Sequence, residues 1–265
     1  MPRTPSSPPT GTLTLYTIAM SHYSEKIRWL MDIEGLPYRE VALTPVFHVL
    51  PALRMGGRGR TTVPVLRSGE HTVQDSTHII EWLATRPGGL RTLPNAQRAE
   101  IMALEDEFDA LGNSVVRYLY QQGFAHTEFI LALWTRFATP AQAGFLRVAY
   151  PVIRAVFKVK LRINEASAQR SARHLDAALT KLEARLADGR RYLVGDQLTV
   201  ADLTAAALLA PLACPPEHGV YGQPEFIEKM ASSGPDWRSR PGLQWVRRLY
   251  AEHRGPFWAQ TPTPH

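Results

Sequence analysis

The stretch TLTLYTIAMSHYSEKIRWLMDIEG, residues 12–35, joins a strand-like pattern to a helix-like pattern at a serine. Residues 12–18 alternate and are rich in β-favouring side chains, which predicts a strand. Residues 22–34 carry apolar side chains at mostly helical spacing, which predicts a helix. Two hydroxyl groups, those of Ser21 and Ser24, therefore lie at the start of the predicted helix.

The position of Ser21 allows two interpretations. The first backbone N–H groups of a helix lack intrahelical partners, and the helix dipole places partial positive charge there. In the simpler interpretation, Ser21 or Ser24 caps the helix by accepting from an N–H two or three residues on. In the other, the Ser21 hydroxyl donates to the sulfur of a bound thiol and lowers the pKa of that thiol. No base is evident near Ser21 in the sequence, so we do not expect it to act as a nucleophile.

The segments after this helix predict a small α/β layer. The pattern predicts strands over 37–43, 62–66 and 71–74, a short helix within 45–60, and a helix over 75–85. Together with the first two elements, the order is βαβαββα. The breaker-rich stretch RPGGLRTLPN, 86–95, lies within a linker over 86–97.

Two features of this layer each have a structural and a functional interpretation. Pro64 lies in the predicted strand 62–66, where it has no N–H for a β-ladder. A cis Val63–Pro64 bond would turn the Val63 backbone toward solvent, free to pair with an extended peptide. An ordinary edge-strand proline is the alternative. Asp75 and Ser76 begin the next helix, where they would cap it, or would hold the ammonium and carboxylate groups of an α-amino acid.

Beyond the linker the sequence predicts helices and no strand. The helical periods cover 96–122, 126–138, 141–162, 165–188, 199–213 and 241–253. We therefore expect a leader over 1–11, an α/β domain over 12–85, an all-helical domain over 98–258 and a tail over 259–265. The apolar segment 123–165 carries interspersed Arg and Lys, and has three interpretations: a core helix pair, a lid over a pocket, or a membrane-surface patch.

Composition excludes several classes of protein. The 265 residues carry a net charge of +6 but no run of five or six like charges, so a nucleic-acid-binding tail is not expected. The single cysteine, Cys214, supports neither a disulfide framework nor a cysteine-based metal site. Residues 1–11 lack the apolar core of a secretory signal. We expect a cytoplasmic protein that needs no metal.

These segments, in this order, resemble the glutathione transferase superfamily. LYTIAMSHYSEKIRWLMDIEGLPYREV looks like its first strand, first helix and second strand, VPVL like its cis-proline strand, and QDSTHIIEWL like its γ-glutamyl-binding turn and third helix. YLVGDQLTVADLTAAALLAPL, 192–212, looks like its buried capping segment, where Thr199 and Asp202 can form a capping box. The resemblance implies an α/β thioredoxin-like N-terminal domain, an all-α C-terminal helical domain, glutathione as co-substrate and usually a homodimer.

The resemblance also implies roles for individual residues. Ser21 becomes the thiol-activating residue, Val63 the backbone clamp, and Asp75 with Ser76 the holders of the γ-glutamyl end. Tyr16 is one position away from the tyrosine of the tyrosine-type classes, and Tyr23 is a rival hydroxyl donor. The glycine carboxylate needs a donor such as His48, Arg58 or Arg60. The residues predicted to bind glutathione are Ser21, Tyr23, Ser24, His48, Arg60, Val63, Pro64, Asp75 and Ser76.

The predicted reaction is attack of the glutathione thiolate on an electrophilic carbon of a hydrophobic molecule. Tyr118, Tyr120 and Phe124 are the predicted electrophile pocket. Isomerisation, dehalogenation and ether cleavage are related reactions of the same kind of site. The absence of cysteine at positions 21 and 24 argues against disulfide exchange. The alternative function is that of a non-catalytic binding or scaffold protein that retains the fold.

Overall fold

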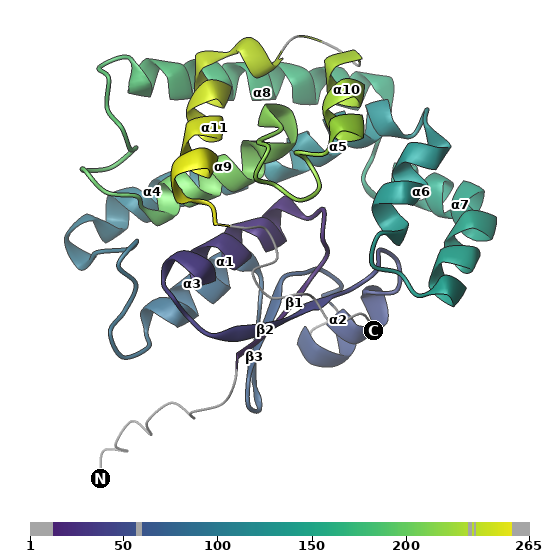
Figure 1. Ribbon diagram of the computed structural model, residues 1–265, viewed down its shortest axis with the longest axis horizontal. Helices are drawn as coiled ribbons and strands as arrows, with labels where there is room; N and C mark the ends of the chain where they lie inside the picture. Colours follow the sequence, from purple (N-terminus) through teal and green to yellow (C-terminus); the bar gives the residue numbers. More distant parts are fainter. Residues whose placement is uncertain (1–12, 57–59, 233–234, 236, 256–265) are drawn as a thin grey trace.

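The N-terminal part of the chain forms a four-stranded mixed sheet with helices packed on it, and the rest is helical, as predicted (Figure 1). The protein is seen in a computed structural model that describes residues 13–56, 60–232, 235 and 237–255. The predicted leader 1–11, the tail 259–265 and Arg58 lie outside these described residues.

The element order of the first domain confirms the predicted βαβαββα pattern. The elements are β1 (Leu13–Thr17), α1 (His22–Ile33), β2 (Tyr38–Ala42), α2 (Val49–Gly56), β3 (Val65–Ser68), β4 (His71–Gln74) and α3 (Ser76–Ala84). The sheet order is β2-β1-β3-β4, with β1 parallel to β2 and antiparallel to β3. The strand predicted over 62–66 begins only at Val65, because Pro64 has no N–H to donate to the ladder.

The described part of the second domain contains only helices. They are α4 (Arg98–Asp109), α5 (Gly112–Gly123), α6 (Thr127–Thr135), α7 (Pro140–Lys160), α8 (Glu165–Leu186), α9 (Val200–Ala213), α10 (Pro224–Ser232) and α11 (Pro241–His253). The sequence pattern missed α10, a short helix that follows a proline-rich stretch. Of the residues in α10, only Phe226 and Met230 are buried.

The helix predicted over 96–122 is two helices, because the chain bends around the Tyr23 side chain. The Tyr23 hydroxyl donates to the carbonyl oxygen of Asp109 at 3.1 Å, at the end of α4. A side chain at Gly112, the first residue of α5, would collide with that hydroxyl group. The bend therefore fixes the end of α4 against the start of α1.

Helix α9 is the centre of the core, and every residue in it is buried. The predicted capping box at its start is confirmed. The Asp202 carboxylate accepts from the Thr199 N–H at 2.8 Å, from the Thr199 hydroxyl at 2.7 Å and from the Leu193 N–H at 2.7 Å. This carboxylate therefore ties the preceding loop to the buried helix that packs against α1.

Helix α1 is also held by a buried chain of ion pairs. Arg28 donates to Glu40 on β2, with 2.8 Å between Nη2 and Oε1, and it pairs with Glu25. On the opposite side of Glu25, Arg254 follows α11 and donates from Nε to Oε1 at 2.8 Å. These groups join the sheet, α1 and the end of the helical domain, so they fix where α1 begins.

Candidate active site

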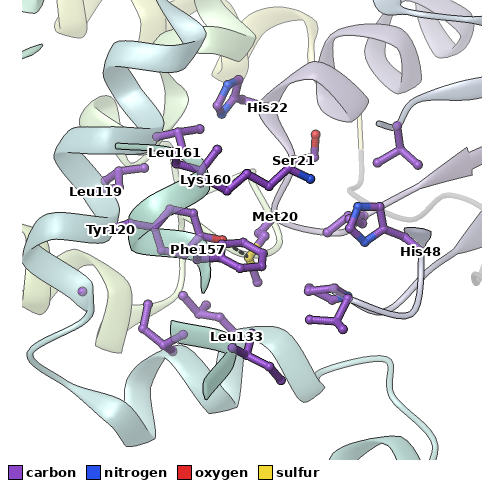
Figure 2. Close-up of a pocket in the computed structure, with 18 of the residues that line it drawn as sticks. Met20, Ser21, His22, His48, Leu119, Tyr120, Leu133, Phe157, Lys160 and Leu161 are labelled. Atoms are coloured by element: carbon purple, nitrogen blue, oxygen red, sulfur yellow. Dashed lines mark hydrogen bonds between the residues drawn. The ribbon is translucent and has the colours of Figure 1, made fainter. Parts of the chain in front are cut away.

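A cavity of about 510 Å³ lies between the first domain and helices α5, α6, α7 and α10 (Figure 2). Its lining is mostly apolar, and among the described residues that line it there is no aspartate or glutamate. Ser21, His22, Tyr23 and His48 line it from the sheet domain, and Gln122, Lys160 and Lys229 line it from the helices. Lys160 extends toward Ser21, so these two residues mark a polar end of a cavity that is otherwise mostly apolar (Figure 2).

Ser21 lies at the polar end and also caps α1. Its Oγ accepts from the Ser24 N–H at 3.2 Å, and its side chain is half-buried against the cavity. Accepting this bond uses an oxygen lone pair, so the hydroxyl hydrogen can still be donated to a ligand. The two interpretations of this serine are therefore compatible, because one side chain can cap the helix and contact a bound anion.

Ser24 does not reach the cavity, contrary to the prediction that it binds glutathione. It is fully buried one turn along α1, and its Oγ accepts from the Ile18 N–H at 3.4 Å. A side chain on that face of the helix points back beneath the end of β1. Ser24 therefore supports the corner from inside, while Ser21 faces the cavity.

Tyr23 lines the cavity, but its hydroxyl already donates to the carbonyl oxygen of Asp109. Burial raises the pKa of this phenol well above its usual range, and the charges of Asp109 and Asp75 add to the increase. The surroundings of Tyr23 therefore disfavour negative charge. Of the two rival hydroxyl donors, Ser21 has the better geometry for a thiolate.

The Val63–Pro64 peptide bond is cis, as predicted. Val63 lines the cavity, whereas Pro64 is buried. The carbonyl oxygen of Pro64 accepts from the Asp75 N–H at 3.4 Å, which joins this turn to the start of α3. The structure therefore places the Val63 turn and Ser21 at the same cavity.

The Asp75–Ser76 pair has a different geometry from the predicted one. The Asp75 carboxylate accepts from the Thr77 N–H at 3.0 Å, so it caps α3 itself. Ser76 is buried, and its hydroxyl donates to Asp109 at 3.4 Å. The Ser76 hydroxyl and the Thr77 N–H thus already have partners within the protein, and neither Asp75 nor Ser76 lines the cavity.

The residues predicted to hold the glycine carboxylate separate into two groups. His48 lines the cavity, and burial, followed by the charge of Lys160, lowers its pKa to about 4. It is therefore neutral near pH 7 and supplies no positive charge. Arg60 is exposed and does not line the cavity.

The sequence analysis missed Lys160, which lines the cavity from α7 and extends toward Ser21 (Figure 2).

Only one of the three residues predicted for the electrophile pocket lines the cavity. Tyr120 does so, and its hydroxyl accepts from Trp134 Nε1 at 3.2 Å. Phe124 is buried behind it, with 4.9 Å between the ring centroids. Tyr118 does not line the cavity but is buried in the main core, where its hydroxyl accepts from Trp237 Nε1 at 2.8 Å. Tyr118 and Tyr120, two residues apart on α5, thus face different sides of the helix.

Comparison with known proteins agrees with this architecture. Residues 15–91 match the family model for the glutathione S-transferase N-terminal domain, and residues 165–252 match the model for its C-terminal domain. The chain belongs to the glutathione S-transferase superfamily. It is 26% identical over 255 residues to glutathione S-transferase TCHQD from Arabidopsis thaliana, covering 90% of each chain.

Solved glutathione S-transferase structures share the fold. A glutathione S-transferase from Methylobacillus flagellatus, solved with glutathione bound, has a TM-score of 0.61 at 14% identity and covers 93% of this chain and 100% of its own. The beta-etherase LigF from Sphingobium has a TM-score of 0.61 at 22% identity, covering 91% of this chain and 95% of its own.

The match to the glutathione S-transferase domain models leaves out residues 92–164, and this gap includes most of the apolar wall of the cavity. The wall residues that the sequence analysis did not name include Leu119, Phe129, Ile130, Leu133, Ile153, Phe157 and Leu161. Helices α6 and α7 pack on each other around a small core that includes Trp134, Leu146 and Tyr150. The segment 123–165 is therefore both a helix pair with its own core and a wall of the cavity.

Proposed function

We propose that this chain is a glutathione transferase that binds glutathione with its sulfur beside Ser21 and joins it to a hydrophobic electrophile. The observation that carries the proposal is the position of Ser21, at the start of α1 and at the polar end of an otherwise apolar cavity. Bound glutathione in the Methylobacillus flagellatus relative supports glutathione as the co-substrate.

In the proposed reaction the glutathione S–H loses its proton to water. The Ser21 hydroxyl donates to the sulfur, and the N-terminus of α1 adds a favourable field, so both act on the thiolate form. Together they would lower the thiol pKa by about two units, enough to make thiolate abundant near pH 7. The thiolate then forms a C–S bond with the electrophilic carbon, and the leaving group departs with its bonding electrons.

Lys160 is proposed to hold the glycine carboxylate of glutathione. It is close enough to His48 for its charge to lower the pKa of that imidazole, and it lies at the polar end of the cavity. The variant K160M should raise the KM for glutathione about tenfold with little change in kcat. K158M is the matched control, because Lys158 is exposed on the same helix and does not line the cavity. A K160M enzyme with unchanged KM would refute this role.

The remaining expectations from the family resemblance stay proposals. We propose a homodimer, located in the cytoplasm and acting in detoxification of electrophiles. Sedimentation velocity of the purified chain tests the dimer, and a species with the mass of one chain at micromolar concentration would contradict it.

The experiment that tests the proposed function compares two serine variants in conjugation of glutathione to an aromatic halide. S21A should lower kcat/KM at least about tenfold, which corresponds to about 1.4 kcal/mol. S24A removes a hydroxyl from the same helix start but not from the cavity, so it should retain kcat/KM within about twofold. Retention on a glutathione column without turnover would support the non-catalytic binding protein instead.

A further inference from the structure

Helix α7 carries an exposed apolar stripe on the side that faces away from its core. Val148 is 85% exposed, Val159 is 79% exposed and Val152 is 69% exposed. The stripe consists of Phe145, Val148, Val152, Val156 and Val159, at spacings of three and four residues, so these side chains share one face of the helix. Five large apolar side chains in contact with water on one helix form a patch of the kind that marks an interaction surface.

The charged residues of α7 itself are all positive. Residues 129–164 contain six Arg and Lys residues and no Asp or Glu. At about 100° per residue, Arg147 and Lys158 lie on one flank of the stripe and Lys160 lies on the other. An apolar stripe with cations on both flanks matches the helices that lie in the interface of an anionic membrane.

We propose that α7 docks on the surface of an anionic lipid bilayer, with its apolar stripe between the headgroups and with Arg147 and Lys158 at the lipid phosphates. No helix in the described part of the chain is long and apolar enough to cross a membrane. A second copy of the same face would bring like charges together, which disfavours self-association there.

The stripe is also continuous with the cavity, which favours a bilayer over an acidic protein. Val152 and Val156 line the cavity and are exposed on the stripe. With the stripe in the membrane, the cavity would open toward the acyl chains. Hydrophobic molecules dissolved in the bilayer would then enter without crossing water. The docking itself does not rest on the reaction proposed for Ser21.

Vesicle co-sedimentation of the full chain tests the proposal. Wild-type protein should bind phosphatidylcholine vesicles that contain phosphatidylglycerol, and should bind them more weakly at high salt and when phosphatidylglycerol is left out. The double variant V148E/V159E should lower the partition coefficient at least about tenfold. Val148 and Val159 do not line the cavity, so turnover of a water-soluble electrophile should not change.

Two further variants separate the apolar contact from net charge and from unfolding. A166E/A177E adds the same two negative charges at exposed positions of α8. Any loss of vesicle binding in this variant is due to net charge, and beyond that loss it should bind like the wild type. V148S/V159S adds no charge and should also weaken binding. Thermal melting of each variant verifies that it is folded.

Three results would overturn the proposal. The first is no binding of the wild type to anionic vesicles. The second is equal binding by the wild type and the folded V148S/V159S variant, which would leave the stripe without a role. The third is loss of a self-association or of an acidic-protein complex in V148E/V159E without loss of vesicle binding, which would assign the stripe to that partner.

Discussion

The two walls of the cavity differ in how the chain builds them. On the sheet side, Ser21 and Val63 contribute through their positions at a helix start and beside a cis-proline turn. On the helical side, Leu133, Ile153 and Phe157 contribute through bulk and shape alone. Backbone geometry therefore fixes the sulfur end of the site, whereas packing fixes the electrophile end. Perturbations of the two walls should therefore have different consequences.

The largest expected effect comes from breaking the buried ion pairs beneath the sheet-side wall. R28A leaves Glu25 and Glu40 without the guanidinium between them, so the free energy of unfolding should fall by about 3–5 kcal/mol. Urea denaturation measures the change. K181A is the control, because it removes an exposed partner of Glu107 and should cost less than about 1 kcal/mol. Similar losses for the two variants would contradict the importance of this chain of ion pairs.

A second effect on the same wall depends on pH through His48. Its pKa in the folded protein, about 4, lies below the ordinary value of 6.5, because burial and then Lys160 disfavour the imidazolium. The stability that this group contributes is therefore present above pH 6.5 and is lost as the pH falls toward 4. H48Q should remove about 2 kcal/mol of that decline.

Urea denaturation at pH 4, 5 and 7 measures the decline, with the exposed His71 in the variant H71Q as the control. If the free energy of unfolding of H48Q decreased between pH 7 and pH 4 as much as that of the wild type, His48 would not be the cause of the decline.

The smallest of these effects belongs to the helical wall and should spare glutathione. F157A removes a ring that lines the cavity, so it should raise the KM for a bulky hydrophobic electrophile about tenfold without changing the KM for glutathione. Y118F changes a tyrosine that faces the core, and should cost about 1 kcal/mol of stability with both KM values intact. Steady-state kinetics with each substrate varied in turn measure the two KM values separately. Equal effects of F157A on both KM values would contradict the assignment of the helical wall to the electrophile alone.

The same difference explains how much the sequence could predict. The order of strands and helices in the first domain, the cis bond at Pro64 and the capping box at Asp202 were predicted, because each depends on a local pattern of residues. The break between α4 and α5 was not predicted, because it depends on Tyr23, which is distant in sequence.

Several site residues could not be predicted either, because they depend on contacts between residues that are far apart in the sequence. Lys160 reaches the cavity from a helix more than a hundred residues after Ser21, and no local motif places it there. Tyr118 and Tyr120 are equally aromatic, and only the rotation of α5 in the fold turns one to the core and the other to the cavity. Asp75 and Ser76 were located correctly at a helix start, but their own partners could not be predicted from that position.

Ultraviolet titration of the thiolate measures the pKa of the thiol of bound glutathione, which the proposed role of Ser21 requires to be lowered. With the wild-type protein we expect a value about two units below that of free glutathione, and with S21A we expect most of that decrease to be lost. S24A should match the wild type. A bound thiol that titrates like free glutathione, or a lowered pKa that survives in S21A, would contradict the claim that Ser21 and the start of α1 stabilise the thiolate.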